Sequence, residues 1–147
     1  INIAGWGEKD AIQSAIKQAD IESNAVFLGR LAPRELAQSL GQANIAILPS
    51  RAESFGRSIA EAQAAGLPVI SYDIGSVPEI VEPGETGWLV PPEQPALLAE
   101  AIAQALDHPE QSYKMGKRGR QRVIERFSWE KTASSIQQAL LTLQPSR

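Results

Sequence analysis

The sequence IAILPSRAESFGRSIAEAQAAG, at residues 45–66, determines the fold that we predict for the whole chain. Its first four residues form an unbroken apolar run, which is expected of a strand buried on both faces. Pro49 ends this strand, because proline has no N–H to donate to a neighbouring strand. A helix rich in alanine should begin near Gly56 and close at Gly66, in the left-handed conformation common at helix ends. The stretch therefore predicts a strand, a polar loop and a helix.

Two glutamates bracket the turn between this strand and this helix. Glu53 lies in the loop, and Glu61 lies in the helix on a face that otherwise carries alanine and serine. Ligands of open parallel sheets bind at the carboxyl ends of strands, where helix N-termini offer free N–H groups. A diphosphate could bind there while the carboxylates accept hydrogen bonds from sugar hydroxyls. These residues alone leave open a plainer interpretation, in which Glu53 is a solvated loop charge and Glu61 a surface helix residue.

Further motifs follow along the chain in a fixed order. They are Pro49-Ser50, Glu53-Ser54-Phe55-Gly56, Glu61-Ala62, Ala65-Gly66-Leu67-Pro68-Val69-Ile70, Gly75, Pro78-Glu79-Ile80-Val81, Gly84, Thr86-Gly87 and Leu89-Val90-Pro91. Together they resemble the donor-binding C-terminal domain of the group 1 retaining glycosyltransferases of GT-B fold (glycosyltransferase family 4-like). Two glutamates separated by seven residues are a hallmark of that family. The resemblance covers essentially the whole chain, and linked motifs are far more specific than any one of them.

The resemblance implies an α/β fold, a three-layer Rossmann-like domain with a mostly parallel sheet and C-terminal helices. It also implies an enzyme, a retaining hexosyltransferase that binds a nucleotide-diphospho-sugar, UDP- or GDP-linked, and presents the sugar to an acceptor. Neither a metal nor a cofactor is expected, since the helix dipole and basic residues upstream would neutralise the diphosphate. The fragment alone should be inactive or very weak, because acceptor and donor must be oriented together.

Site residues are carried over from the resemblance position by position. Glu53 is the catalytic candidate and would position the donor sugar, while Glu61 would accept from the ribose hydroxyls. Arg57 begins the central helix and could assist the diphosphate. Arg30 could meet the nucleotide base or be a solvated charge. The donor-binding candidates are Ser54, Phe55, Gly56, Arg57, Glu61, Arg30, Leu31 and Gly5.

Two positions depart from glycine patterns. Ser76 follows Gly75 where the family usually has a second glycine, and serine narrows the choice of φ there. The Gly5-Trp6-Gly7 turn is not a dinucleotide-binding fingerprint, because Asp10 replaces the third glycine.

The other predicted elements come from apolar spacing and from proline and glycine positions. Strands are expected at 1–4, 25–28, 69–72 and, as an edge, 88–90; one helical turn at 78–81; and helices around 12–19 and at 33–41, 95–106, 109–125 and 128–143. The basic run Lys114, Lys117, Arg118, Arg120, Arg122 and Arg126 is interpreted as the solvated face of a helix whose Met115 and Val123 point inward. A nucleic-acid or anionic-membrane patch is the alternative. Phe127 and Trp129 should pack in the core or against another domain.

Composition limits the classes of protein. The 147 residues fit one domain, 1–147, and the absence of cysteine excludes disulfides and thiolate metal sites. A net charge of −3 argues against a nucleic-acid partner, and no apolar run is long enough to span a bilayer. We expect a cytoplasmic location. The chain opens on a strand without an initiator methionine, so we expect a fragment that lacks an N-terminal acceptor domain.

Partners and rival functions stay open at this stage. The expected partners are a nucleotide sugar and the missing N-terminal domain, with peripheral membrane association through that domain as a further possibility. A nucleotide-sugar epimerase of similar fold is one alternative function. A non-catalytic module, with a vestigial pocket and a helical tail that contacts other proteins, is another. The sequence does not identify the sugar, the base, the acceptor or the oligomeric state.

Overall fold

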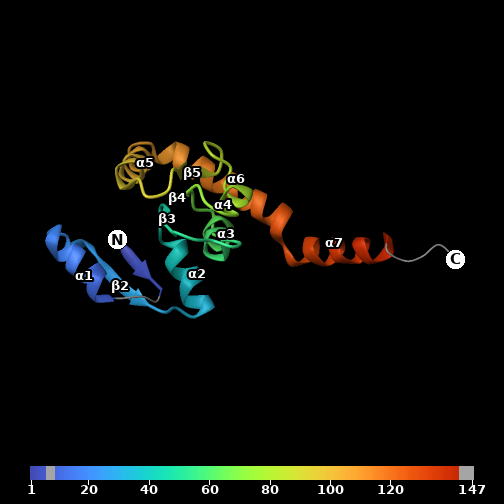
Figure 1. Cartoon of the computed structure of the whole chain (residues 1–147), viewed down its shortest axis with the longest axis horizontal. Coiled ribbons are helices and arrows are strands. Elements are labelled where there is room, and N and C mark those ends of the chain that lie inside the picture. The colour runs from blue at the N-terminus through green and yellow to red at the C-terminus, as the bar shows by residue number, and fades with distance from the viewer. Residues whose placement is uncertain (6–8, 143–147) are drawn as a thin grey trace. The chain divides into compact units, whose positions relative to one another are not determined.

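The computed structural model describes residues 1–5 and 9–142 (Figure 1). The chain divides into two compact units, which span residues 1–39 and 40–147. Within the described ranges no helix is both long and apolar enough to cross a membrane. The expectation of a single domain over 1–147 stays a prediction.

The first unit contains a parallel pair of strands. Its elements are β1 (Asn2–Ala4), α1 (Lys9–Gln18), the 3-10 helix η1 (Glu22–Asn24), β2 (Val26–Gly29) and the beginning of α2 (Pro33–Gly41). Asn2 lies opposite Val26 and Ala4 opposite Gly29. Ile16 of α1 is the buried apolar residue of this unit among those described. The strand–helix–strand order explains the parallel pairing, because a helical crossover returns the chain to the same end of the sheet.

The second unit contains a three-stranded parallel sheet in the order β3-β4-β5. Its elements are β3 (Ala46–Leu48), α3 (Arg57–Ala64), β4 (Val69–Tyr72), α4 (Val77–Ile80), β5 (Gly87–Val90), α5 (Pro95–Asp107), α6 (Pro109–Phe127) and α7 (Trp129–Thr142). β4 is the central strand, and every one of its residues is buried. Parallel strands and helices follow the predicted α/β pattern closely.

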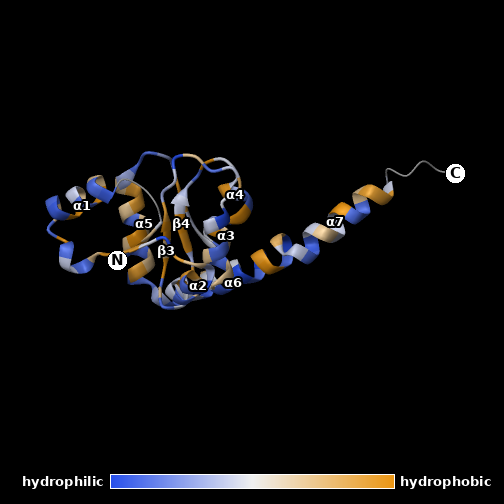
Figure 2. Cartoon of the chain, turned by 90° about the horizontal axis from the view of Figure 1, so that it is seen from below, coloured by the Kyte–Doolittle hydropathy of each residue, from blue (hydrophilic) through white to orange (hydrophobic). Residues whose placement is uncertain are grey.

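Helices cover both faces of β4, so the second unit has three layers. Val69 packs into a cluster with residues of α3, α4 and α6, whereas Ile70 and Tyr72 pack with Ala101 and Ala105 of α5. Successive side chains of a strand point to opposite faces, which explains this division. In Figure 2 the apolar strands β3 and β4 run between α5 and α3.

Close backbone packing joins α6 to the end of α3. A methyl group on Gly116 of α6 would lie 2.0 Å from the carbonyl oxygen of Gly66. Gly119, one turn later, leaves room for the buried side chain of Gln63. Gly66 itself has φ +86°, the left-handed conformation predicted for the residue that closes α3. Glycines therefore let α6 approach the helix that carries Glu61.

One sequence prediction about burial needs correction. The run 45–48 was expected to be buried on both faces, but Ile47 is 38% exposed. The reason is that β3 is an edge of its sheet, whereas β4 is the strand buried on both sides. Phe127 packs against the core, as predicted, whereas Trp129 is 85% exposed, so that its packing against another domain stays a prediction. The inward positions predicted for α6, Met115 and Val123, are both buried.

Candidate functional site

The loops that follow β3 and β4 touch at the carboxyl end of the sheet. Gly75 has φ +50°, and a methyl group on it would lie 2.2 Å from the carbonyl oxygen of Glu53. No side chain fits between these two backbones. The loop after β4 is therefore a support for the loop that carries Glu53.

A side chain on β4 also ties the two strand ends together. The hydroxyl of Ser71 donates a 2.7 Å hydrogen bond to the carbonyl oxygen of Leu48, the last residue of β3. We call the residues of these two loops and the start of α3, 49–57 and 73–76, the rim. Ligands of parallel sheets bind at this end of the strands.

Glu53 is held on the rim by its own loop. Its Oε1 accepts a 2.9 Å hydrogen bond from the backbone N–H of Gly56, which has φ +89° and precedes α3. A carboxylate is favoured there, because the N-terminus of a helix carries partial positive charge. Glu53 is half-buried and bonded to backbone, so it is not simply a solvated loop charge.

Two side chains of the core, from Ile80 and Ile59, pack close to Gly56. A methyl group on Gly56 would lie 3.1 Å from Cδ1 of Ile80 and 3.3 Å from Cδ1 of Ile59. Ile80 belongs to α4 and Ile59 to α3, and both are fully buried. The position of the Glu53 loop therefore depends on where α4 lies.

Glu61 lies one turn into α3 with a cation beside it. Nε of Arg57 donates to Oε1 of Glu61 at 2.9 Å, and the two side chains are 84% and 35% exposed. Such an exposed pair at i,i+4 contributes little to stability, about 0.3–0.5 kcal/mol. Both groups are accessible, and the first turn of any α-helix leaves N–H groups without an intrahelical acceptor.

Phe55 connects the rim to the end of α6. Its ring meets the ring of Phe127 edge-on, with centroids 5.8 Å apart and planes at 72°. Ser54 and Phe55 are exposed, as a ligand contact requires. The structure thus brings six candidates together at the rim and the first turns of α3: Glu53, Ser54, Phe55, Gly56, Arg57 and Glu61.

The remaining candidates, Gly5, Arg30 and Leu31, lie in the first unit. The N–H of Gly5 donates to the carbonyl oxygen of Gly29 at 2.9 Å, so the loops after β1 and β2 lie side by side. Trp6 and Gly7, the rest of the predicted glycine turn, lie outside the described residues. A shared site for these three candidates and Glu53 rests on the family resemblance.

Ser76 adopts a backbone conformation open to any residue. Its φ is −86° and its ψ is 0°, so the replacement of a second glycine by serine causes no strain here. Its Oγ is buried without a hydrogen-bond partner in the part of the chain that the structure describes. Nor do those described residues include a cluster of histidine, aspartate and glutamate that could hold a metal ion.

Two arginines of α6 make contacts that the sequence did not reveal, because the basic run was interpreted as a solvated face. Arg122 is only 19% exposed and donates to the backbone oxygens of Ile80 at 3.0 Å and Glu79 at 3.1 Å. It also pairs with Glu82 at 3.0 Å. Arg118 donates to the carbonyl oxygen of Glu85 at 2.8 Å and is 46% exposed. For Arg122 the solvated-face prediction is wrong.

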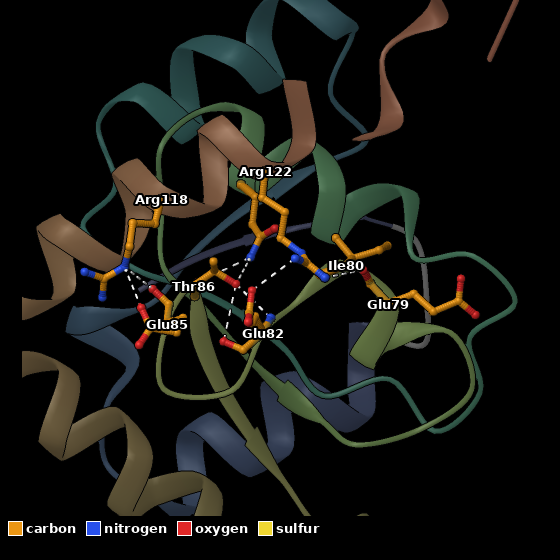
Figure 3. A network of polar contacts seen from close by, with 8 residues as sticks. Glu79, Ile80, Glu82, Glu85, Thr86, Arg118 and Arg122 are labelled. Atoms are coloured by element: carbon orange, nitrogen blue, oxygen red, sulfur yellow. Dashed lines mark hydrogen bonds and ion pairs between the residues drawn. The ribbon is translucent and has the colours of Figure 1, made fainter. Parts of the chain in front are cut away.

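Figure 3 shows these contacts, which we call the clamp: Arg118 and Arg122 of α6 against residues 79–86. At its centre Oγ1 of Thr86 accepts from the N–H of Glu82 at 2.8 Å and from Nε2 of Gln63 at 3.0 Å. No sequence signal pointed to the clamp, because Arg118, Arg122 and Gln63 lie 23 to 43 residues from their partners in it.

Comparison with known proteins identifies the family. Residues 1–122 match the family model described as "Glycosyl transferases group 1". The chain belongs to this family. The resemblance that the glutamate motif suggested is therefore confirmed.

Relatives and solved structures agree with this assignment. Glycogen synthase from Mycobacterium tuberculosis strain H37Rv is 34% identical over 142 residues, which cover 96% of this chain and 34% of that protein. Sucrose-phosphate synthase from Thermosynechococcus elongatus has a TM-score of 0.88 and 32% identity over 97% of this chain and 38% of that one. Anabaena Alr3699/HepE, solved in complex with UDP-glucose, has a TM-score of 0.84 and 26% identity, covering 97% of this chain and 40% of its own.

Two points follow from these matches. The α/β fold of a GT-B C-terminal half is confirmed, since the structural neighbours are GT-B glycosyltransferases. The chain spans about a third of the length of the curated relatives it matches, for example 34% of glycogen synthase.

Proposed function

We propose that the chain is the donor-binding half of a retaining hexosyltransferase, which binds a nucleotide-diphospho-sugar at the rim. The observation that carries this proposal is the bond between Glu53 and the N–H of Gly56, at the positive end of α3. It places a carboxylate and free helix N–H groups within one loop and one turn, with Glu61 beyond them. An activated sugar offers both hydroxyls and a diphosphate, and these groups match that arrangement.

Each group at the rim would bind a different part of the donor. The first turn of α3 would hold the diphosphate, and Glu61 would accept hydrogen bonds from the ribose hydroxyls. Arg57 lies beside Glu61 and could turn toward the phosphates, since its side chain is 84% exposed. Glu53 would position the sugar from the loop that Gly75 supports.

Catalysis would follow from charge developing on the leaving nucleotide. As the bond from the sugar to the diphosphate breaks, negative charge grows on the phosphate oxygens at the N-terminus of α3. Preorganised N–H groups stabilise such charge without having to reorient during the reaction. Neither a metal nor a cofactor is part of this proposal.

The identity of the donor is the finer part of the proposal. A UDP-linked sugar is favoured by the structural neighbour solved with UDP-glucose, whereas a GDP-linked donor is the other choice. The acceptor would bind to a part of the protein outside this chain, since the chain covers only about a third of the length of its curated relatives, 34% for glycogen synthase. A cytoplasmic location, and peripheral membrane association through that other part, stay predictions.

A calorimetric titration tests the donor site. This chain would be titrated with UDP, GDP and ADP and their sugar conjugates, and the same series repeated with Glu61→Gln. The control is Glu110→Gln, which changes a glutamate in the first turn of α6. We expect one nucleotide to bind, with affinity reduced about tenfold or more in Glu61→Gln and unchanged in Glu110→Gln.

Two outcomes would contradict the proposal. One is a folded chain that binds no nucleotide, either alone or within the full-length protein. The other is binding that Glu61→Gln leaves unchanged. The first outcome would favour a non-catalytic module, and the second would place the nucleotide elsewhere.

A further inference from the structure

We infer that Arg122 of α6 is a positioning residue of the donor site, acting on Glu53 through α4. The inference rests on the proposed function, since it names a residue that holds the donor loop in place. Arg122 does not reach the rim in this structure. Among the described residues, its side-chain hydrogen bonds and its ion pair all go to residues 79–82.

The first step is the contact of Arg122 with α4. This helix has only four residues, Val77–Ile80, and so short a helix is not stable by itself. Its last carbonyl groups need donors from elsewhere, and Arg122 supplies two of them, to Glu79 and Ile80. The guanidinium group can do this because its five N–H donors form a rigid planar fork.

The second step runs from Ile80 to Gly56. The backbone oxygen of Ile80 accepts from Arg122, and its Cδ1 lies so near Gly56 that an added methyl group there would be only 3.1 Å away, closer than an ordinary van der Waals contact. The N–H of Gly56 is the group that holds the carboxylate of Glu53. A shift of Ile80 would therefore disturb the loop at this bond.

The third step runs through the other end of α4. The N–H of Val77 donates to the carbonyl oxygen of Ile74 at 3.0 Å, which fixes the turn that contains Gly75. Gly75 lies directly against the backbone of Glu53. The two ends of α4 thus meet the Glu53 loop at two points, and Arg122 holds α4 between them.

Arg118 provides a matched comparison one turn earlier on the same helix. It also donates from Nε to a backbone oxygen, that of Glu85 at 2.8 Å, and pairs with a glutamate carboxylate at 3.1 Å. Figure 3 shows both arginines reaching from α6, Arg122 toward Glu79 and Ile80 at the end of α4 and Arg118 toward Glu85. Glu85, however, belongs to the turn before β5 and touches neither α4 nor the rim in any contact that the structure records. Of the two arginines, only Arg122 bonds to α4, which packs against the loop that carries Glu53.

The experiment compares four variants of this chain with the unmodified chain. Arg122→Met and Arg118→Met remove the charge and the hydrogen-bond donors but keep an unbranched apolar side chain in place of the arginine stem. Arg122→Lys keeps the charge but loses the fork, and Glu82→Gln removes the ion pair while leaving the bonds to Glu79 and Ile80. For each variant we would measure the affinity for UDP, the Tm and the amide NMR shifts of Gly56 and Gly75.

We expect Arg122→Met and Arg118→Met both to lower the Tm. Of these two variants, only Arg122→Met should move the amide signals of Gly56 and Gly75 and weaken UDP binding, by about tenfold. Arg122→Lys should resemble Arg122→Met, since a single ammonium cannot replace the planar fork. Glu82→Gln should retain the affinity of the unmodified chain.

The outcomes separate this inference from the proposed function. If the unmodified chain binds UDP and Arg122→Met matches Arg118→Met in affinity and amide shifts, the inference is wrong and the donor site stands. Full affinity in Arg122→Lys would also overturn it, because charge alone would then explain the effect. If the unmodified chain and the full-length protein bind no nucleotide, the proposed function itself fails. Should Arg122→Met not fold, the amide shifts of Arg122→Lys decide.

Discussion

The rim and the clamp are both polar regions of the second unit, but they are built in opposite ways. At the rim the bonds are local, three residues apart for Glu53 and Gly56 and four for Arg57 and Glu61. In the clamp the bonds made by Arg118, Arg122 and Gln63 join residues 23 to 43 positions apart, and Gln63 and Thr86 are buried. The difference indicates that the groups at the rim are arranged locally and stay available to a ligand, whereas the long-range contacts of the clamp hold the loops in place.

The largest effect should come from Gly75, where the rim depends on a close backbone contact. Gly75→Ala would place a methyl group 2.2 Å from the carbonyl oxygen of Glu53, at φ +50°. We expect a loss of about 2 kcal/mol or more in the free energy of unfolding, together with a loss of nucleotide affinity. Chemical denaturation and UDP titration measure these two quantities.

Gly84→Ala is the matched control for this prediction. Gly84 has φ +78°, but nothing lies within 4 Å of an added methyl group. It should cost only about 1 kcal/mol of backbone strain and leave UDP affinity unchanged. Equal effects of Gly75→Ala and Gly84→Ala on affinity would show that the close contact between Gly75 and the backbone of Glu53 does not contribute to nucleotide binding.

The next effect concerns the centre of the clamp. Thr86→Val removes the oxygen that accepts from Glu82 and Gln63, so that buried donors lose an acceptor. We expect a loss of about 1–3 kcal/mol in unfolding free energy. Thermal denaturation would measure it, with the exposed Thr132→Val as a control expected to change stability by less than about 0.5 kcal/mol. A Thr86→Val protein as stable as Thr132→Val would contradict the structural role of the clamp.

A smaller effect is expected for the ion pair at the rim. A double-mutant cycle of Arg57→Met and Glu61→Gln should give a coupling free energy of about 0.5 kcal/mol or less, because the pair is exposed. The coupling should fall further as salt is added. A coupling above about 1.5 kcal/mol would mean that this pair holds structure, as the clamp does.

The smallest effect is at the start of α7. The backbone N–H of Glu130 and the hydroxyl of Ser128 lower the pKa of the Glu130 carboxyl below its usual value of 4.5. The folded-state pKa is therefore below that of the unfolded chain, so the stabilisation is present above pH 4.5 and is lost as the pH falls through the folded value. In an NMR titration Ser128→Ala should raise this pKa toward 4.5, and an unchanged pKa would show that Ser128 has no part in it.

The same contrast explains what the sequence could predict. The turn at Gly66 and the strand Val69–Tyr72 depend on neighbours along the chain, and the structure has them as predicted. The placement of Glu53 in the loop before α3 and of Glu61 within α3 is local as well, whereas the roles of both residues toward a donor stay predictions. The interpretation of Arg122 as a solvated charge failed, because its three acceptors lie about 40 residues upstream. The prediction that Ile47 is buried failed for a similar reason, since an apolar run does not reveal whether its strand is central or at an edge.

The measurement that tests the donor site most directly is an amide NMR titration of this chain with UDP. The account predicts that the signals of residues 53–61 and 75–77 move together and saturate, while those of Glu85 and Arg118 stay in place. Saturable shifts confined to other parts of the chain would contradict the account. So would shifts that involve the clamp at Glu85 and leave Gly56 and Glu61 unchanged.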